Sequence, residues 1–181
     1  MIKGIRRTAA IGTAALALGI GSAVWAMSAA SAASSPAIPP TCTSGNLAVW
    51  VNADEGNGAA GTIYYPLEFT NTSGHACRTF GYPGVSATNA SGKQLGDGAG
   101  RNPLYRASTV TIPAGGTAHA ILFYGDAEVG TSGCKPTTAS LLKVYAPNQT
   151  SARHTFFDLP VCTLTHHTYL RVTVIRPGAN M

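Results

Sequence analysis

Ile63-Tyr64-Tyr65-Pro66-Leu67-Glu68-Phe69-Thr70 is the stretch that decides the fold class of this 181-residue chain. Large apolar side chains fall at every second position, and successive side chains of a β-strand point to opposite faces of a sheet. The alternation therefore predicts a strand with one face buried in a core. Pro66 has no backbone N–H to donate, which predicts that this strand lies at a sheet edge or contains a bulge.

The same alternation recurs on both sides of this stretch. Leu47–Val51 alternates upstream of it, and Leu170–Ile175 alternates close to the C-terminus. After residue 32, no window keeps apolar residues at the i, i+3, i+4, i+7 spacing of an amphipathic helix, while Gly and Pro recur every few positions. We therefore expect a fold made almost entirely of strands.

Two segments predict hairpins, because a turn sequence separates two alternating runs. Thr109–Tyr124 is interrupted by Pro113-Ala114-Gly115-Gly116, and Ser140–Phe157 is interrupted by Pro147-Asn148-Gln149-Thr150. Seven or eight short strands with regular turn signals are typical of an immunoglobulin-like β-sandwich. We therefore predict an all-β, immunoglobulin-like sandwich that is crosslinked by two disulfides.

The disulfide pairing follows from the position of the turns. Antiparallel hairpins bring together residues that are equidistant from their turn, so the midpoint of each pair should fall in a turn. The midpoint of one pair is Asn148, and that of the other lies in the Gly-rich segment Glu55–Gly61. Of the three pairings that four cysteines allow, we predict Cys42–Cys77 and Cys134–Cys162, each adding roughly 3 kcal/mol of stability.

Residues 1–32 predict a secretory signal peptide. Lys3, Arg6 and Arg7 precede an uncharged apolar stretch, and Ala30-Ser31-Ala32 is a cleavage motif. The alternative is an uncleaved membrane anchor, because Ala9–Met27 approaches the ~20 residues of a spanning helix. Small residues fill more than half of that stretch, which favours cleavage. We expect a secreted, extracellular protein, with cell-wall association as an option and the choice between Sec and twin-arginine export left open.

Removing the signal peptide changes the charge of the chain. The whole sequence has 12 basic and 7 acidic residues, and three of the basic ones lie in the signal, which leaves 9 against 7 and a net charge of +2. These nine are scattered along the sequence, whereas a nucleic-acid footprint needs clustered Lys and Arg. We therefore expect no nucleic-acid partner, and no membrane span once the signal is cleaved.

The domain organisation that follows is simple. After cleavage, 149 residues remain of the 181, which fits one domain of the usual ~100 to 200 residues. Residues 33–41 form a Ser/Pro-rich tether that cannot bury a core. Residues 42–178 are predicted to form a single β-sandwich domain.

Several short blocks together resemble a known family. The most specific block runs from Phe69-Thr70-Asn71 through Cys77 to Gly81-Tyr82-Pro83-Gly84-Val85. Weaker matches are Cys42, Leu47-Ala48-Val49, Cys134, Leu142-Lys143-Val144, Val161-Cys162 and Val172-Thr173-Val174. With these blocks the chain resembles the domain of unknown function 4232 family of exported proteins from high-GC Gram-positive bacteria. The resemblance implies an immunoglobulin-like sandwich and a secreted or envelope location, and it implies no activity and no functional residue.

No motif predicts an enzyme. There is no G-x-S-x-G elbow and no phosphate-binding glycine loop, and pairing of all four cysteines leaves no free thiol. We predict no catalytic residue and no cofactor, and the alternative is an exported hydrolase whose site is assembled from separate strands. The Gly81–Gly84 segment predicts a shaped turn rather than a recognition loop.

A binding surface is predicted in the polar, Gly-rich segment Gly96–Arg106. It carries Arg101, Tyr105 and Arg106, residue types that are enriched in interaction hot spots, and loops on a rigid scaffold commonly carry function. We expect an extracellular protein, glycan or small ligand as the partner, with a mobile loop that has no partner as the alternative.

Neither the histidines nor the acidic residues predict a metal site. His166 and His167 are adjacent and would point to opposite faces of a strand, and no H-x-H or H-x-x-x-H spacing occurs. The five histidines are therefore expected at the surface or in loops. Asp54–Gly58 has too few carboxylates for a calcium loop and is expected to be a solvated hairpin tip.

Overall fold

The computed structural model of this chain describes residues 37–126, 133–164, 166 and 168–181. The predicted signal peptide and the first part of the tether, residues 1–36, lie outside the described residues, and so does His167. Within the described part of the chain, no helix is long and apolar enough to cross a membrane.

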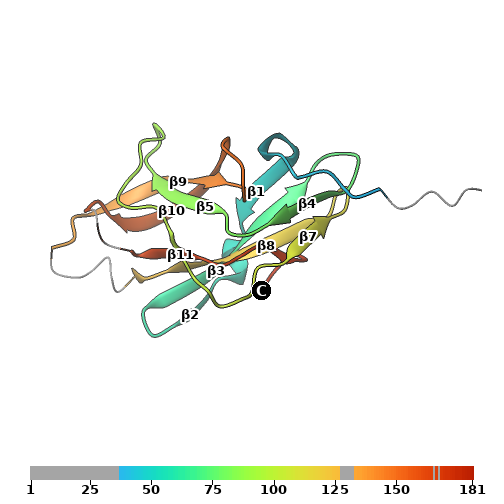
Figure 1. The fold of residues 1–181 in the computed structure, drawn as a ribbon. Helices are drawn as coiled ribbons and strands as arrows, with labels where there is room; N and C mark the ends of the chain where they lie inside the picture. Colours follow the sequence, from blue (N-terminus) through green and yellow to red (C-terminus); the bar gives the residue numbers. More distant parts are fainter. Residues whose placement is uncertain (1–36, 127–132, 165, 167) are drawn as a thin grey trace, which may run out of the picture. The chain divides into compact units, whose positions relative to one another are not determined.

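The regular structure of the described residues consists of strands, apart from two short 3-10 helices, as the alternating patterns predicted (Figure 1). Eight of the strands have four residues or more in this part of the chain, which agrees with the predicted seven or eight. The elements are η1 (Ser44–Asn46), β1 (Leu47–Val51), η2 (Ala53–Glu55), β2 (Asn57–Ala59), β3 (Thr62–Asn71), β4 (Cys77–Phe80), β5 (Gly84–Thr88), β6 (Gly100–Arg101), β7 (Thr109–Ile112), β8 (Thr117–Tyr124), β9 (Pro136–Tyr145), β10 (Ala152–Cys162), β11 (Leu170–Val172) and β12 (Arg176–Pro177).

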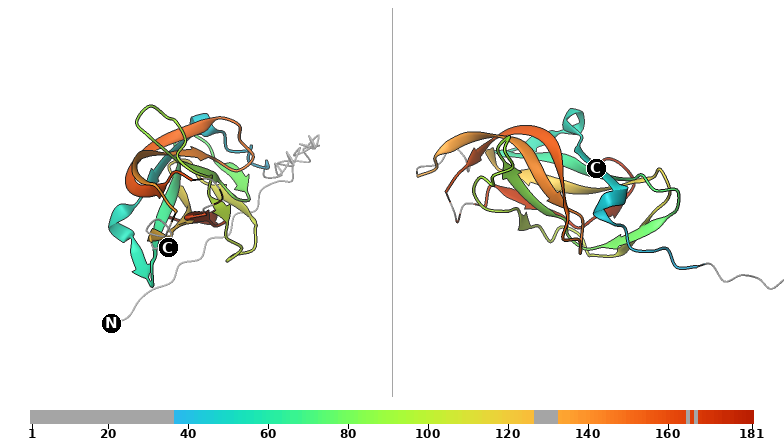
Figure 2. Two further views of the ribbon diagram at one scale, coloured as in Figure 1. Left: turned by 90° about the vertical axis from the view of Figure 1, so that its left-hand side faces the viewer. Right: turned by 90° about the horizontal axis from the view of Figure 1, so that it is seen from above.

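The sheets form a sandwich-like arrangement. One layer has the strand order β1-β3-β8-β11-β6, with β2 also paired to β3 and β12 also paired to β8. The other layer consists of the three-stranded sheet β10-β9-β5 and the two-stranded sheet β4-β7. Figure 2 shows the same sheets from two further sides.

The core lies between the layers and is built by the alternation seen in the sequence. Leu67 and Phe69 of β3 and Leu142 of β9 have no exposed surface and belong to one hydrophobic cluster. The rings of Tyr65 in β3 and Phe157 in β10 meet edge to face with their centroids 4.9 Å apart, which joins the two layers. Aromatic pairs in this geometry add to the free energy gained by burial alone.

The prediction that Pro66 marks a sheet edge or a bulge is wrong. β3 lies inside its sheet, paired with β1 on one side and with β8 on the other. The carbonyl of Pro66 accepts a hydrogen bond from the Asn52 N–H, 2.9 Å away, just beyond the end of β1 at Val51. Because the N–H and C=O of a residue in an antiparallel strand point to the same side, the missing donor of Pro66 faces the place where β1 has already ended.

The prediction of a hairpin over Thr109–Tyr124 is also wrong. β7 pairs with β4, and β8 pairs with β3, so the turn at residues 113–116 carries the chain from one layer to the other. Asn71 at the end of β3 explains this, because its backbone exchanges hydrogen bonds of 2.9 Å with Gly115 and Gly116. Its side-chain amide donates to the carbonyl of Ile112, 3.0 Å away. The turn is thereby tied to β3, and β8 continues along β3 from that point.

The second predicted hairpin is confirmed. β9 and β10 pair in antiparallel register with Tyr145 opposite Ala152, and the register shifts between Phe156 and Leu159. Phe156, beside this irregularity, is 88% exposed. It lies on the outer face of β10, because the neighbouring Thr155 is buried and successive residues alternate in direction.

Both predicted disulfides are present, Cys42–Cys77 and Cys134–Cys162, with Cα atoms 4.9 Å and 5.4 Å apart. The second disulfide crosslinks the open end of the β9–β10 hairpin, as expected. The first has a different geometry, because Thr41 pairs with Arg78 of β4 in parallel orientation, so the two cysteines lie on parallel segments rather than on the arms of a hairpin. Two disulfides in a chain of this size are typical of an oxidising, extracellular environment.

Candidate functional site

The Gly-rich segment Gly96–Arg106 crosses from one layer of the sandwich to the other. The N–H of Ala99 donates to the carbonyl of Val85 in β5, 2.8 Å away. β6 then pairs in parallel with β11, with Arg101 opposite Val172. The segment is therefore attached by backbone hydrogen bonds to β5 at one end and to β11 at the other.

Arg101, one of the three predicted binding residues, is exposed and stacks on an aromatic ring. Its guanidinium carbon lies 5.2 Å from the centroid of the Tyr82 ring. Tyr82 belongs to the turn that connects β4 and β5, and the carbonyl of Gly81 in that turn accepts a hydrogen bond from Ile175, 3.0 Å away. The Gly81–Gly84 turn thus has the structural role expected of it, and it also supplies the ring beneath Arg101.

Tyr105, the second predicted residue, forms a tighter pair of the same kind. The guanidinium carbon of Arg176 in β12 lies 3.9 Å from the centroid of the Tyr105 ring. The third predicted residue, Arg106, is exposed next to Tyr105. We call Tyr82, Arg101, Tyr105 and Arg176 the arginine–tyrosine edge, since guanidinium groups stack well on aromatic faces.

A hollow of about 240 Å³ lies on the outer face of the β3–β8–β11 sheet. Tyr64, Phe123 and Arg171 are neighbours across three adjacent strands, since Phe123 pairs with Tyr64 on one side and with Arg171 on the other. The rings of Tyr64 and Phe123 stand at 87° with centroids 4.9 Å apart. We call this the outer-face hollow, and its full lining is Thr62, Tyr64, Asn102, Phe123, Gly125, Thr168, Tyr169 and Arg171.

The hollow and the arginine–tyrosine edge share one segment of the chain. Asn102 lines the hollow, and Arg101, the residue before it, forms part of the edge. Arg171, which lines the hollow, pairs with Gly100 on the neighbouring strand, and neighbouring strands lie about 4.8 Å apart. The two features therefore meet at β6, at the edge of the sheet: Arg171 faces the outer side, whereas Arg101 lies opposite the buried Val172 and reaches the Tyr82 ring on the other side.

Tyr169 is a buried titratable residue in the lining of the hollow. Burial raises the pKa of Tyr169 to about 12, with a smaller contribution from the charge of Asp97, and the Tyr169 hydroxyl donates to the Leu95 carbonyl, 2.9 Å away. An arginine is always protonated in proteins. Among the described residues, the lining contains no carboxylate and no histidine.

The structure corrects one expectation about the histidines. His119 was expected at the surface or in a loop, but it lies in β8 and is only 7% exposed. Its Nδ1 is 2.9 Å from the Gly178 carbonyl, and it pairs across strands with Glu68, which is 2% exposed and accepts a hydrogen bond from the Asn52 side chain. The alternation of β3 suggested a polar outward position at Glu68, and no local signal indicates that this face is covered.

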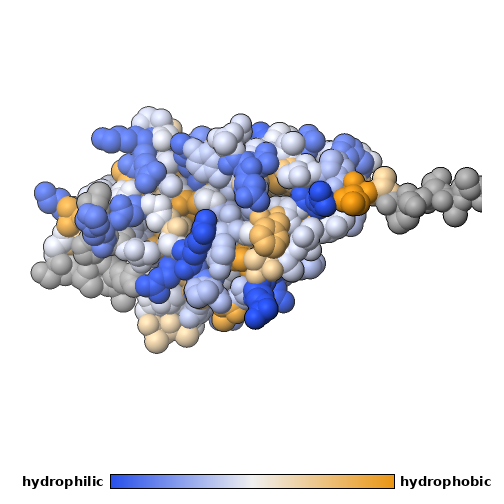
Figure 3. Space-filling model, viewed as in Figure 1, coloured by the Kyte–Doolittle hydropathy of each residue, from blue (hydrophilic) through white to orange (hydrophobic). Residues whose placement is uncertain are grey.

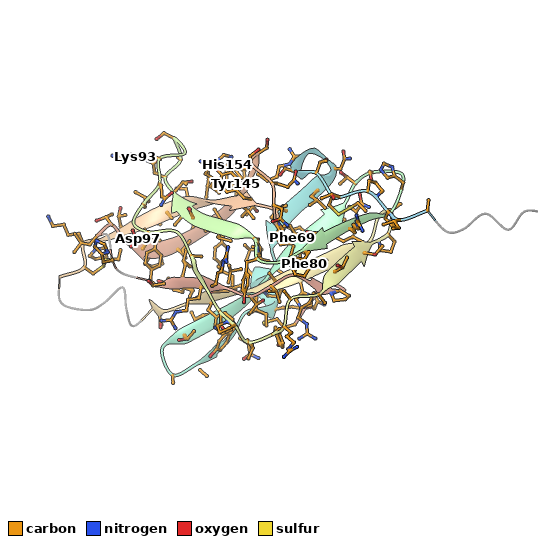
Figure 4. All side chains as sticks on the ribbon, in the orientation of Figure 1. Phe69, Phe80, Lys93, Asp97, Tyr145 and His154 are labelled. Carbon is orange, nitrogen blue, oxygen red and sulfur yellow. A yellow bond between two sulfur atoms is a disulfide. The ribbon has the colours of Figure 1, made fainter. Side chains whose placement is uncertain are left out.

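The remaining polar candidates do not come together. His75, His154 and His166 are exposed, as predicted. Figure 4 shows His154 on the β9–β10 side of the molecule, well apart from Asp97. Within the part of the chain that the structure describes, no three histidine, cysteine or acidic residues are grouped so that they could hold a metal ion. The acidic segment Asp54–Gly58 spans η2 and the start of β2 and is exposed.

Comparison with known proteins gives one result. A family model described as Domain of unknown function (DUF4232) matches residues 42–176. The chain has no significant match among curated proteins or among solved structures.

Proposed function

The chain belongs to the DUF4232 family, a family without an assigned function, and we propose that it is a secreted, non-enzymatic module that binds a ligand of the cell envelope. Its binding surface in this proposal is the outer-face hollow together with the arginine–tyrosine edge. Both lie on the predicted binding segment Gly96–Arg106 or in contact with it.

The single observation that carries the proposal is the pair of stacked arginines. Arg101 stacks on Tyr82 and Arg176 stacks on Tyr105, and each pair joins the segment to a distant part of the chain. A stacked guanidinium keeps its N–H groups at the rim of its plane, where they can donate to a ligand. Stacking also restricts the side chain before binding, so less conformational entropy is lost when a ligand arrives.

The non-enzymatic part of the proposal is supported by the composition of the surface. General acid–base catalysis needs groups whose pKa lies near the working pH, and the hollow is lined by Tyr, Phe, Thr, Asn, Gly and Arg. These residue types suit hydrogen bonding and packing rather than proton transfer. The secreted part is supported by the signal-peptide pattern of residues 1–32 and by the two disulfides.

The test is co-sedimentation of the full chain, purified with both disulfides formed, with cell walls from the organism that encodes it. We expect the wild-type protein to sediment with the walls. The amount of the Arg101→Ala variant retained on the walls should be about 5- to 30-fold lower, because truncating a hot-spot residue costs about 1 to 2 kcal/mol of binding free energy. Arg78→Ala is the matched control, since it removes the same charge from an exposed arginine of β4, in the other layer.

Two outcomes would contradict the proposal. Equal retention of the two variants would show that the walls bind a different part of the protein. Absence of wild-type retention would show that the walls contain no ligand for it. Release of soluble wall fragments during the incubation would contradict the non-enzymatic assignment and favour a hydrolase.

A further inference from the structure

We infer that the ligand of this surface is an acidic glycan, a chain of sugar rings that carry carboxylate or phosphate groups. The inference rests on the proposed function and specifies its ligand. It follows from the charge that the fold gathers at the surface and from the aromatic rings beside that charge.

The first step is that the fold concentrates basic residues that are scattered in the sequence. The pairing of β6 with β11 brings Arg101 beside the strand that carries Arg171, and the stacking of Arg176 on Tyr105 brings it beside Arg106. Of the nine basic residues outside the signal peptide, three therefore gather along the arginine–tyrosine edge, Arg101, Arg106 and Arg176, and a fourth, Arg171, lies in the outer-face hollow on the other side of β6. A clustered positive surface attracts anionic ligands.

The second step is the chemistry of the positive groups. All four are arginines, whose planar fork of N–H donors matches the geometry of carboxylate and phosphate oxygens. The guanidinium carbons of Arg101 and Arg176 lie over tyrosine rings, 5.2 Å and 3.9 Å from the ring centroids. This arrangement favours a ligand whose acidic groups are spaced along a chain, so that separate arginines can each bind one.

The third step is the outer-face hollow. Tyr64 and Phe123 supply aromatic surface, while Asn102, Thr62 and Thr168 supply amide and hydroxyl groups. A site of this kind combines apolar packing with a few polar groups that fix orientation, and a sugar ring presents both C–H faces and hydroxyl groups to such a site. At about 240 Å³ the hollow is smaller than the 300 to 1,000 Å³ of typical sites for whole ligands, which suits one ring of a longer chain.

The polymer must therefore carry both features, rings for the hollow and acids for the arginines. On the face of the molecule in Figure 3, hydrophilic and apolar residues are interspersed without one continuous apolar area. A neutral glycan would offer no acidic group to Arg101, Arg106 and Arg176, and a phosphate polymer without sugars would offer no ring to Tyr64 and Phe123.

The test is isothermal titration calorimetry of the full chain with both disulfides formed. Four probes separate the features: tetragalacturonate, which carries carboxylates; maltotetraose phosphorylated on its sugar hydroxyls; unmodified maltotetraose; and inorganic tripolyphosphate. We expect at least one of the two acidic sugars to bind about tenfold or more tightly than both maltotetraose and tripolyphosphate, because hydrogen bonds to charged groups are the stronger ones. Which acidic sugar binds better distinguishes carboxylate from phosphate as the acid.

Variants locate the binding. Arg101→Ala and Tyr64→Leu should each lower the affinity for the acidic sugar about tenfold. Two matched controls, Arg78→Ala and Phe156→Leu, should leave it unchanged, since Arg78 lies on β4 and the 88% exposed Phe156 on β10. Equal affinity for maltotetraose would overturn the role of charge, and equal affinity for tripolyphosphate would overturn the role of the sugar. If no probe binds while wall retention still depends on Arg101, the ligand class is wrong and the proposed function stands; if wall retention also fails to depend on Arg101, both are wrong.

Discussion

The guanidinium of Arg176 lies 3.9 Å from the centroid of the Tyr105 ring, which joins β12 near the C-terminus to the segment that follows β6. This contact holds one side of the proposed binding surface in place. We expect Arg176→Ala to lower the free energy of unfolding by about 0.5 to 2 kcal/mol, the range for a cation–π pair. Arg176→Lys should recover part of the loss, because lysine keeps the charge without the planar stacking group. Urea denaturation measures both, with Arg106→Ala as the control at a neighbouring exposed arginine; a loss as large for Arg106→Ala would contradict the account.

Asn71 is predicted to be one of the most important polar residues for stability. It is fully buried, and its amide donates to the carbonyls of His75, Ile112 and Pro113 at 2.8, 3.0 and 3.1 Å. Asn71→Ala should lower the free energy of unfolding by about 2 to 4 kcal/mol, since several buried hydrogen bonds are lost together.

Asn89 provides the matched control for this substitution. Its side-chain carbonyl accepts hydrogen bonds from residues that follow it in a turn, and those bonds are exposed. Asn89→Ala should cost less than about 1 kcal/mol. Similar losses for the two variants in chemical denaturation would show that Asn71 does not organise the crossing between the layers.

Gly96 is predicted to tolerate no side chain. Its φ is +69°, and a Cβ added there would collide with the carbonyl oxygen of Cys162. Gly92 has a similar φ of +80° with no atom within 4 Å of an added Cβ. Gly92→Ala should therefore cost only about 1 to 2 kcal/mol for the left-handed backbone, and Gly96→Ala should cost at least twice as much. Thermal unfolding followed by circular dichroism compares them, and equal melting temperatures would rule out the close packing of this segment on β10.

Stability should fall in alkaline solution partly because of Tyr169. Its pKa is raised by burial to about 12, from the ordinary value of 10.0. Below about pH 10 the phenol is protonated in both the folded and the unfolded chain. Between pH 10 and 12 only the unfolded chain loses this proton, so the free energy of unfolding decreases as the pH rises through that window.

Tyr169→Phe removes this ionisation and should make the pH dependence shallower. A smaller dependence should remain, because burial also raises the pKa of Tyr124. The variant should start from a lower stability at pH 8, since it loses the hydrogen bond to Leu95, worth about 0.5 to 1.5 kcal/mol. Urea titrations at several pH values between 8 and 11.5 give both quantities, and parallel curves for the two proteins would disprove the role of Tyr169.

The parts of the fold that the sequence predicts correctly are those specified by neighbouring residues. The alternation around Leu67 and Phe69 identifies a strand whose inner face is buried, and the turn at Pro147–Thr150 identifies the β9–β10 hairpin. The disulfide pairs were also predictable, although Cys42 reaches Cys77 along a parallel segment. In each case the information lies in short-range pattern and chain symmetry.

The errors arise where distant residues decide the outcome. The turn at Pro113–Gly116 indicates a change of direction, but whether its two strands pair with each other depends on Asn71, which binds the turn from β3. Pro66 is accommodated inside a sheet because β1 ends at Val51. Neither relationship has a local signal in the sequence.

The candidate site likewise has a local part that the sequence predicts and a part that depends on distant residues. Composition was enough to select Arg101 and Tyr105, but their partners Tyr82 and Arg176 come from other parts of the chain. The outer-face hollow depends on the register of β3, β8 and β11, which places Tyr64, Phe123 and Arg171 side by side. A sequence read without that register shows only two aromatic residues and an arginine at unrelated positions.

The most direct test of the binding surface is a heteronuclear NMR titration of the ¹⁵N-labelled, disulfide-bonded chain with tetragalacturonate and, separately, with phosphorylated maltotetraose. The account predicts that the largest chemical-shift changes occur at the backbone amides of Arg101, Asn102 and Tyr105 and at the side-chain N–H groups of Arg101 and Arg176. Changes centred instead on the outer face of the β10-β9-β5 sheet around Phe156, or no changes with either sugar, would contradict it.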